Sequence, residues 1–414
     1  MHCTVVRRVI SVTATTRPRV AVLGGAVGGL ATAADRFAAF ADVTLFERQS
    51  YDDKRVNCGE AITESSVVPL ATTPENGFLN RIEGFDLHVY PSTDRDAMAS
   101  PLASTTITVD EGFVTDRDVV ERRWADRLRR RGVDVCEGTN VSVGRYREIV
   151  DDFDLVVDAT GQPALSLKAA GRTGAYTGDV VALNADVEAA SETPHRPDIV
   201  FEGHLGYFWV FPKSDRRANV GIGGAGEERP DNYIEELWGA CDRFGVPRPA
   251  REDGIYTIPR GPSLDPEHTH RNGNVFLVGD AAGIANRYQG EGISQAIRSS
   301  SLLADLVKQG RVAEYPRRLH ESMRAEYRLA TLMRGVWEST EDPELLASVA
   351  RAIDGLGVED VTRRPWRVIA RIARHPRLLV RLLGIAGVRS RLVDAYTDTW
   401  EYDSARRAET ATGG

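Results

Sequence analysis

Six residues near the start of the chain have the spacing of a phosphate-binding turn. The segment reads Gly24-Gly25-Ala26-Val27-Gly28-Gly29 and follows the apolar run from Arg19 to Leu23. The fingerprint places glycine at its first, third and sixth positions, so Gly24 and Gly29 fit while Ala26 stands in the middle. The middle glycine lets a backbone approach a pyrophosphate, and Gly25 and Gly28 on either side of Ala26 can relax the turn. Amides at the start of the following helix favour a diphosphate.

Glu47 ends the next apolar run at the spacing of a carboxylate that accepts hydrogen bonds from a ribose. We place Arg48, its neighbour, in the same cofactor-binding set. Glycine turns also occur for packing alone, and Glu47 could be a solvated strand end. The turn and the flanking elements therefore predict a dinucleotide without identifying which one.

Two later strand ends carry polar residues in the order that such a site needs. Asp158-Ala159-Thr160-Gly161 ends one apolar run, and Val278-Gly279-Asp280-Ala281-Ala282-Gly283 ends another. A carboxylate just past a strand end is fixed in place and accepts hydrogen bonds from adjacent hydroxyls, which favours Asp280 as a ligand. The alternative is a simple cap of the following helix.

A row of aromatic residues could form an apolar wall. Tyr207, Trp209 and Phe211 alternate, so in a strand they share one face. Such a face suits a long apolar substrate, although an aromatic core stripe would look the same. Cys58 and Glu60 lie in a glycine-bearing loop, the kind of segment that often carries active-site groups, or they serve packing and solvation.

The elements that must position these residues predict an α/β protein with an α+β second domain. Strand, glycine turn, helix and strand (Val43 to Glu47) make a βαβ unit of a Rossmann-type domain. Val114 to Arg131 predicts an amphipathic helix, and Asp154 to Val157 and Asn274 to Val278 predict further buried strands. Short segments from about Val180 to Ile258 predict an antiparallel sheet, and the chain from Tyr315 onward reads as mostly helical.

Composition narrows the class of protein. The 414 residues are 42% hydrophobic and 27% charged, an ordinary globular balance, and the net charge of −8 argues against nonspecific nucleic-acid binding. The cysteines are scattered without CxxC spacing, so we expect no metal site. Met1 to Arg17 is a poor signal peptide and no apolar run approaches about 18 residues. We expect a cytoplasmic protein.

Four segments together resemble the geranylgeranyl reductase family of flavoproteins. They are Cys58-Gly59-Glu60, the aromatic stretch Gly206 to Pro212 with Lys213, Gly279 to Gly283, and Gly290-Glu291-Gly292-Ile293. The resemblance runs from about Arg19 to Leu306. Two departures are Ala26 and Asn286-Arg287, where members often carry Asn-Pro.

The resemblance implies FAD as cofactor and assigns roles to the motifs. It implies a turn over the dinucleotide at Gly161, Gly279 before the ribityl ligand Asp280, amides of Gly290, Gly292 and Ile293 against the flavin pyrimidine, and Arg117 near the cofactor. It implies a discontinuous FAD-binding domain (17–165 with 272–330), a substrate-binding antiparallel-sheet domain (166–271) and a C-terminal helical region (331–414). It also places Cys58 in the active-site region.

The implied reaction is saturation of the double bonds of geranylgeranyl chains on lipids or prenyl diphosphates. An isolated alkene accepts hydride poorly, so a proton donor must help: Cys58, Glu60 or a water that they hold. The external electron donor would be reduced ferredoxin or NAD(P)H. Alternatives are an FAD-dependent monooxygenase of a small organic substrate and a flavoprotein carrier of electrons to quinone.

The C-terminal region is basic and amphipathic. From Arg363 to Leu392 it carries many arginines and no acidic residue, and Pro376 predicts a division into two helices. Such a segment can lie on an anionic membrane surface, which would add peripheral contact at the inner membrane. A helical cap with its arginines in solvent is the alternative.

Overall fold

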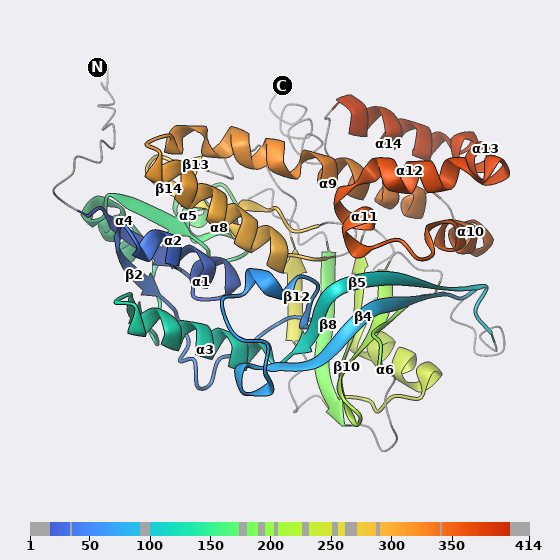
Figure 1. Cartoon of the computed structure of the whole chain (residues 1–414), viewed down its shortest axis with the longest axis horizontal. Coiled ribbons are helices and arrows are strands. Elements are labelled where there is room, and N and C mark those ends of the chain that lie inside the picture. Colours follow the sequence, from blue (N-terminus) through green and yellow to red (C-terminus); the bar gives the residue numbers. More distant parts are fainter. Residues whose placement is uncertain are drawn as a thin grey trace.

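The computed structural model describes residues 17–33, 35–91, 100–173, 180–188, 195–202, 206–225, 232–250, 256–260, 271–286, 290–339 and 342–397. A six-stranded sheet has the order β13-β14-β7-β1-β2-β6 (Figure 1). Only the β13–β14 pair is antiparallel. Its strands are β1 (Arg19–Leu23), β2 (Asp42–Phe46), β6 (Asp134–Cys136), β7 (Leu155–Asp158), β13 (Arg271–Asn272) and β14 (Val275–Leu277).

A second, eight-stranded sheet has the order β12-β8-β11-β10-β9-β4-β5-β3, and its one parallel pair is β4–β9. Its strands are β3 (Ala61–Ile62), β4 (Phe78–Val89), β5 (Ala103–Thr115), β8 (Val180–Glu188), β9 (Asp198–Phe201), β10 (Gly206–Ser214), β11 (Arg217–Ala225) and β12 (Tyr256–Arg260). The antiparallel pattern expected over 180–258 is therefore present, interrupted by helix α6 (Tyr233–Phe244).

Segment 17–165 supplies strands to both sheets, because β3, β4 and β5 join the second one. The helix expected from Val114 was wrong at its start. Val114 pairs with Ala61 and Thr115 with Phe78, so α3 (Arg117–Arg130) begins only after β5.

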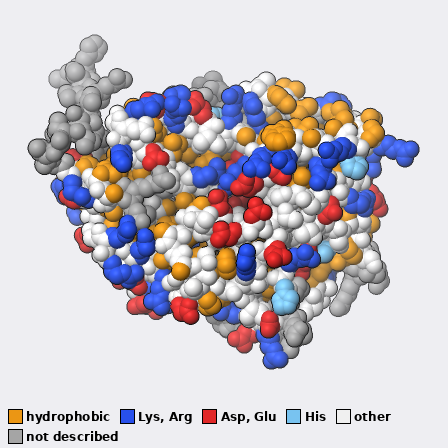
Figure 2. Space-filling model, in the orientation of Figure 1, with side chains coloured by type: hydrophobic (Ala, Val, Ile, Leu, Met, Phe, Trp, Pro, Cys, Tyr) orange, Lys and Arg blue, Asp and Glu red, His pale blue; other side chains and the backbone are white. Residues whose placement is uncertain are grey.

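Helices form the C-terminal part, which Figure 1 draws in orange and red. They are α9 (Tyr315–Glu338), α10 (Pro343–Ile353), α11 (Val358–Arg363), α12 (Pro365–Ala373), α13 (Pro376–Gly384) and α14 (Ala386–Thr397). Pro376 opens α13, as its sequence position predicts, but the segment from Arg363 to Leu392 is divided once more, so that it holds α12, α13 and the start of α14 and not two helices. Figure 2 shows hydrophobic side chains gathered over the same part of the surface as α12 to α14. None of the described helices is both long and apolar enough to cross a membrane.

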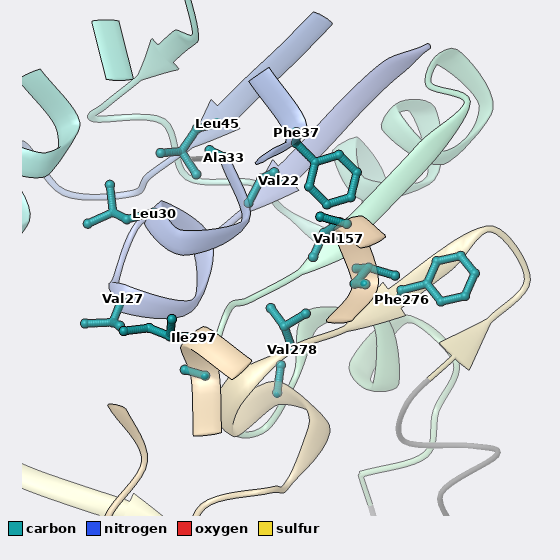
Figure 3. Packing of buried hydrophobic residues seen from close by; sticks show 14 of the residues in the cluster. Val22, Val27, Leu30, Ala33, Phe37, Leu45, Val157, Phe276, Val278 and Ile297 are labelled. Carbon is teal, nitrogen blue, oxygen red and sulfur yellow. The ribbon is translucent and has the colours of Figure 1, made fainter. Parts of the chain in front are cut away.

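The apolar strands of the first sheet are buried on both faces, which explains their unbroken hydrophobic sequence. Val20 and Val22 of β1 pack with helices α1 (Val27–Ala33), α3 and α8 (Ile293–Lys308). Ala21 and Leu23 point to the opposite face, toward α4 (Val143–Asp152) and α5 (Leu165–Ala169). Figure 3 shows the first of these cores, in which sheet residues such as Val22 and Val157 meet helix residues such as Leu30 and Ile297. The short α2 (Asp35–Ala38) adds Phe37 to it.

Candidate functional site

A cavity of about 410 Å³ is lined by the carboxyl edge of the first sheet, by one face of the second sheet and by helices α9 to α11. Most of the site residues predicted from sequence line it, although they come from distant parts of the chain. They are Ala26, Gly28, Cys58, Glu60, Arg117, Gly161, Tyr207, Trp209, Phe211, Gly279, Asp280, Gly290, Gly292 and Ile293. Gly24, Gly29, Glu47 and Arg48 are not among the lining residues.

Gly24 and Gly29 make the turn possible rather than line the cavity. Gly24 has φ +95°, and a Cβ there would lie 2.4 Å from the carbonyl oxygen of Ala159. A Cβ on Gly29 would lie 1.7 Å from the carbonyl oxygen of Gly24. The helix therefore packs directly on the turn, which leaves Ala26 and Gly28 facing the cavity.

Glu47 holds the glycine turn against the end of β2. Its carboxylate accepts hydrogen bonds from the N–H groups of Gly25 (2.8 Å) and Gln49 (2.9 Å) and from Lys54 Nζ (2.9 Å). Burial raises the pKa of Glu47, but the Lys54 cation and these hydrogen bonds outweigh it and lower the pKa overall. Glu47 is therefore a buried, charged anchor, while Arg48 is exposed beside it.

The ends of β7 and β14 lie side by side because these strands are parallel neighbours. Asp158 is fully buried and accepts hydrogen bonds from the N–H and hydroxyl of Thr160 and from the N–H of Ser166, at 2.7–3.0 Å. These bonds fix the turn that ends at Gly161 (φ +78°). Across from it, Asp280 reaches the cavity from the turn Gly279–Ala282. The carboxyl edge of the first sheet thus presents the Asp280 carboxylate and the turn that ends at Gly161 to the same cavity.

Helix α8 begins at Ile293, at the cavity wall. Gly290 before it has φ +71°, a conformation that favours glycine. Glu291 also lines the cavity. Burial and the nearby Glu326 carboxylate raise its pKa, although the Arg363 cation lowers it in part. Arg287 lies outside the described residues.

The Cys58–Glu60 loop rests on the aromatic strand β10. A Cβ on Gly59 would lie 3.0 Å from Phe211 Cε2 and 3.3 Å from Trp209 Nε1. The N–H of Glu60 donates to Cys58 Sγ at 3.2 Å. The loop therefore brings Cys58 and Glu60 to the cavity together.

Arg117 connects this loop to helix α3. Its backbone N–H donates to Glu60 Oε1 at 3.0 Å and its guanidinium donates to Glu121 Oε1 at 3.1 Å. Burial lowers the pKa of Arg117, but Cys58, with which it also hydrogen-bonds, and the carboxylates of Glu121 and Glu60 raise it overall. The Arg117 cation is consequently held inside the site and is not a surface salt bridge, since its side chain is 14% exposed.

Tyr207, Trp209 and Phe211 form a continuous aromatic wall. Neighbouring ring centroids are 5.8 and 6.1 Å apart. Trp209 Nε1 donates to Asn219 Oδ1 at 3.0 Å, and its ring covers Gly221, where a Cβ would lie 2.1 Å away. Three further rings extend the wall to both sides, so that its order is Phe85, Phe211, Trp209, Tyr207, Phe201 and Trp337.

Two buried lysines near the cavity and part of its apolar lining had no site role assigned from the sequence. Lys213 is buried against Glu60, and Lys54 against Glu47 and Glu121. The signal was available, because lysine is rare in this arginine-rich chain and two of its four lysines are these buried ones. The apolar lining from the C-terminal helices carried no such signal; it comprises Met333, Trp337, Ile353, Val358 and Val361.

Comparison with known proteins gives relatives at low identity, and no family model matches the chain. The chain is 24% identical over 409 residues to a digeranylgeranylglycerophospholipid reductase of Methanocella arvoryzae, covering 88% of this chain and 98% of the relative. It is 28% identical to the protein of that name from Thermoplasma acidophilum, covering 70% and 78%.

Solved structures share the fold. A geranylgeranyl bacteriochlorophyll reductase-like protein from Thermoplasma acidophilum superposes with a TM-score of 0.64 at 18% identity, covering 89% of this chain and 98% of that one. The flavin-dependent halogenase CmlS gives a TM-score of 0.60 at 16% identity, covering 89% and 79%. The fold is thus that of flavin-dependent enzymes, with a helical C-terminal part.

Proposed function

We propose, from the premise that the chain belongs to the geranylgeranyl reductase family, that it is an FAD-dependent reductase of carbon–carbon double bonds in isoprenoid chains. The observation that carries this proposal is the single cavity wall that runs from the glycine cradle to six aromatic rings. A cradle alone would fit any dinucleotide enzyme, whereas the aromatic extension fits a long apolar substrate.

The residues present fit FAD. Gly28 and Gly161 leave open space at the cavity wall, since a Cβ on Gly161 would meet nothing within 4 Å and one on Gly28 only ordinary contacts. We propose that Asp280 accepts hydrogen bonds from the ribityl hydroxyls, that Glu47 and Arg48 lie toward the adenosine, and that Arg117 lies near the flavin. Gly290, Gly292 and Ile293 would present amides to the flavin pyrimidine. The cofactor supplies hydride chemistry when it is reduced.

The apolar part of the cavity supports a prenyl chain as substrate. Tyr207, Trp209 and Phe211 line it, and α9 to α11 add apolar side chains to the lining. Charged side chains line the cavity as well, among them Glu291 and Arg334. We propose reduced ferredoxin or NAD(P)H as the external electron donor.

We further propose that α12 to α14 contact an anionic membrane surface. Every large hydrophobic side chain that is exposed among the described residues lies on these helices: Trp366, Ile369, Val380, Leu383, Val393 and Tyr396. Exposed arginines such as Arg374 and Arg377 lie between them. Apolar side chains ringed by cations complement anionic head groups over acyl chains.

The test is a single-turnover reaction without oxygen. Protein with reduced flavin is mixed with a geranylgeranyl lipid, and flavin reoxidation is followed by absorbance. The mass of the lipid product is then measured by mass spectrometry. We expect a gain of two hydrogens for each flavin oxidised. Flavin reoxidation only with oxygen, with an oxygen atom in the product, would establish a monooxygenase instead. Reoxidation by a quinone with an unchanged lipid would establish an electron carrier.

A further inference from the structure

A cluster of charged side chains meets the cavity at Glu60. The ammonium of Lys213 contacts the carboxylates of Glu60, Asp116 (3.0 Å) and Asp186 (2.7 Å). The guanidinium of Arg217 contacts Asp116 and, at 3.1 Å, Asp186. Three carboxylates therefore face two cations, and the cluster has one negative charge in excess.

The groups around the cluster do not remove that excess. The carboxylate of Asp118 lies within 4.8 Å of the carboxylates of Glu60 and Asp116, which adds further negative charge. The other charged neighbours balance one another, two cations against two carboxylates: Lys54 and Arg117 with Glu47 and Glu121. One proton bound to a carboxylate would relieve the repulsion.

Glu60 is the carboxylate on which that proton is most stable. Its side chain is 8% exposed, whereas those of Asp116 and Asp186 are 18% and 36% exposed. Burial raises the pKa of Glu60 to about 7 despite the Lys213 cation, and the charge of Asp186 adds to the rise. For Asp186 burial also raises the pKa, but Lys213, Asn219 and Arg217 lower it overall. Glu60 thus holds a proton near neutral pH while Asp186 is ionised.

The backbone fixes the direction of the Glu60 side chain. Its φ of +64° is the only positive φ at a non-glycine residue in the described part of the chain, and such conformations persist where surrounding bonds enforce them. Here the N–H and hydroxyl of Thr115 donate to the Glu60 carbonyl at 3.0 and 2.9 Å. Cys58, the other candidate donor, uses its sulfur as an acceptor for the Glu60 N–H.

We infer that Glu60 is the catalytic acid of the proposed alkene reduction and that Lys213, Asp186, Asp116 and Arg217 are positioning residues that keep its proton at the cavity wall. This inference rests on the proposed function. The O–H bond of Glu60 breaks as a C–H bond forms at one alkene carbon, and the other carbon takes the hydride that reduced flavin supplies. The alkene gains the two electrons that the flavin loses, and the Glu60 carboxylate regains a proton from water.

The kinetic test is the pH dependence of single-turnover alkene reduction. The wild-type rate should fall above about pH 7, because Glu60 then loses its proton. Glu60→Gln should lower the rate by about 10²- to 10⁴-fold, the usual range for a lost general acid, and should abolish this fall. Asp186→Asn should move the fall to lower pH and Lys213→Met to higher pH, because one removes a negative charge near Glu60 and the other a positive charge. Asp126→Asn, a surface change on α3, is the control and should leave the profile unchanged.

A readout independent of activity is the infrared carboxyl band of flavin-loaded protein without substrate. The wild-type minus Glu60→Gln difference spectrum should show a protonated carboxyl that disappears as pH passes about 7. A carboxyl band that titrates near pH 4.5, or a wild-type rate in Glu60→Gln, would overturn the inference. If Lys213→Met does not fold, the shift of the pH profile in Asp186→Asn still decides. A wild type that reduces no prenyl chain would overturn the proposed function and this acid role together. Normal reduction with a Glu60-independent profile would overturn this inference alone.

Discussion

At the scale of single residues, two buried carboxylates of the same site have opposite protonation behaviour. Burial acts on both Glu47 and Glu60, yet the pKa of Glu47 is lowered overall and that of Glu60 is raised. The difference lies in their partners. Glu47 accepts two backbone N–H bonds and shares its ammonium with one other carboxylate, whereas Glu60 accepts one backbone N–H bond and shares its ammonium with two others. Burial alone therefore does not decide which carboxylate can deliver a proton.

Asp280 offers the simplest test of the cofactor. Asp280→Ala should weaken FAD binding by about 1.5–3 kcal/mol, the worth of a hydrogen bond to a charged group, which is about 10- to 100-fold in Kd. The measurement is flavin retained after gel filtration, followed by titration of the stripped protein with FAD. Asp305→Ala, on the far part of α8 and outside the cavity lining, is the control and should retain flavin like the wild type. Unchanged FAD affinity in Asp280→Ala would contradict the ribityl role.

At the scale of elements, strand β10 has two faces with separate duties. Phe208 and Val210 pack with Leu237 of α6, whereas Trp209 and Phe211 face the cavity. The period of two along a strand makes this division possible within four consecutive residues. Substitutions on the cavity face should therefore affect the reaction, and those on the α6 face should affect stability.

Trp209→Ala should slow prenyl reduction at least tenfold and weaken lipid binding, because it removes the centre of the aromatic wall. FAD occupancy should stay close to that of the wild type. Phe208→Ala is the matched change on the opposite face, and it should lower the midpoint of thermal unfolding by creating a core cavity. Steady-state KM for the lipid and the flavin spectrum separate the two effects. Equal loss of FAD and lipid binding in Trp209→Ala would remove the substrate role of the wall.

The elements that could be predicted from the sequence are those whose signal lies in neighbouring residues. The glycine turn, the buried strands and the alternation in β10 follow from spacing alone, and so did the start of α13 at Pro376. The last residues of β5, Val114 and Thr115, were predicted as helix, because their strand conformation depends on pairing with β3 and β4 and has no local signal. The rarity of lysine marks Lys213, but its partners were not predictable, because Asp186 of β8, Arg217 of β11 and Asp116 at the start of α3 meet only in the folded protein.

At the scale of the whole molecule, the large hydrophobic residues that are exposed in the described part of the chain all lie on α12 to α14. Figure 2 shows this region beside a band of cationic side chains. Trp366 of α12 and Val380 of α13 are 60% and 70% exposed, so both helices present a large apolar side chain to solvent. The same helices bury Val368, Leu378 and Leu382 against the body of the protein, so both faces of α12 and α13 are apolar in part.

The membrane proposal predicts binding to vesicles that contain anionic lipid. In co-sedimentation, the wild type should bind vesicles with phosphatidylglycerol more strongly than neutral ones, and salt should weaken this binding. The double variant Trp366→Asp with Val380→Asp should lose at least tenfold in partitioning while keeping its flavin. Lys308→Asp, at the end of α8, gives a similar charge change elsewhere and should retain most of the binding. Equal sedimentation of the double variant would show that α12 and α13 do not dock.

The two faces of strand β10 also differ in how freely their residues can change during evolution. Positions 208 and 210 are tied to the hydrophobic packing under α6, so most replacements there are lost through instability. Positions 207, 209 and 211 contribute to the cavity, and replacements there alter what fits while the sheet ladder stays intact. Gly221 opposite Trp209 is a cross-strand restraint, because it admits a large ring only while it lacks a side chain. Substrate preference can therefore drift along one side of a strand whose other side is held constant.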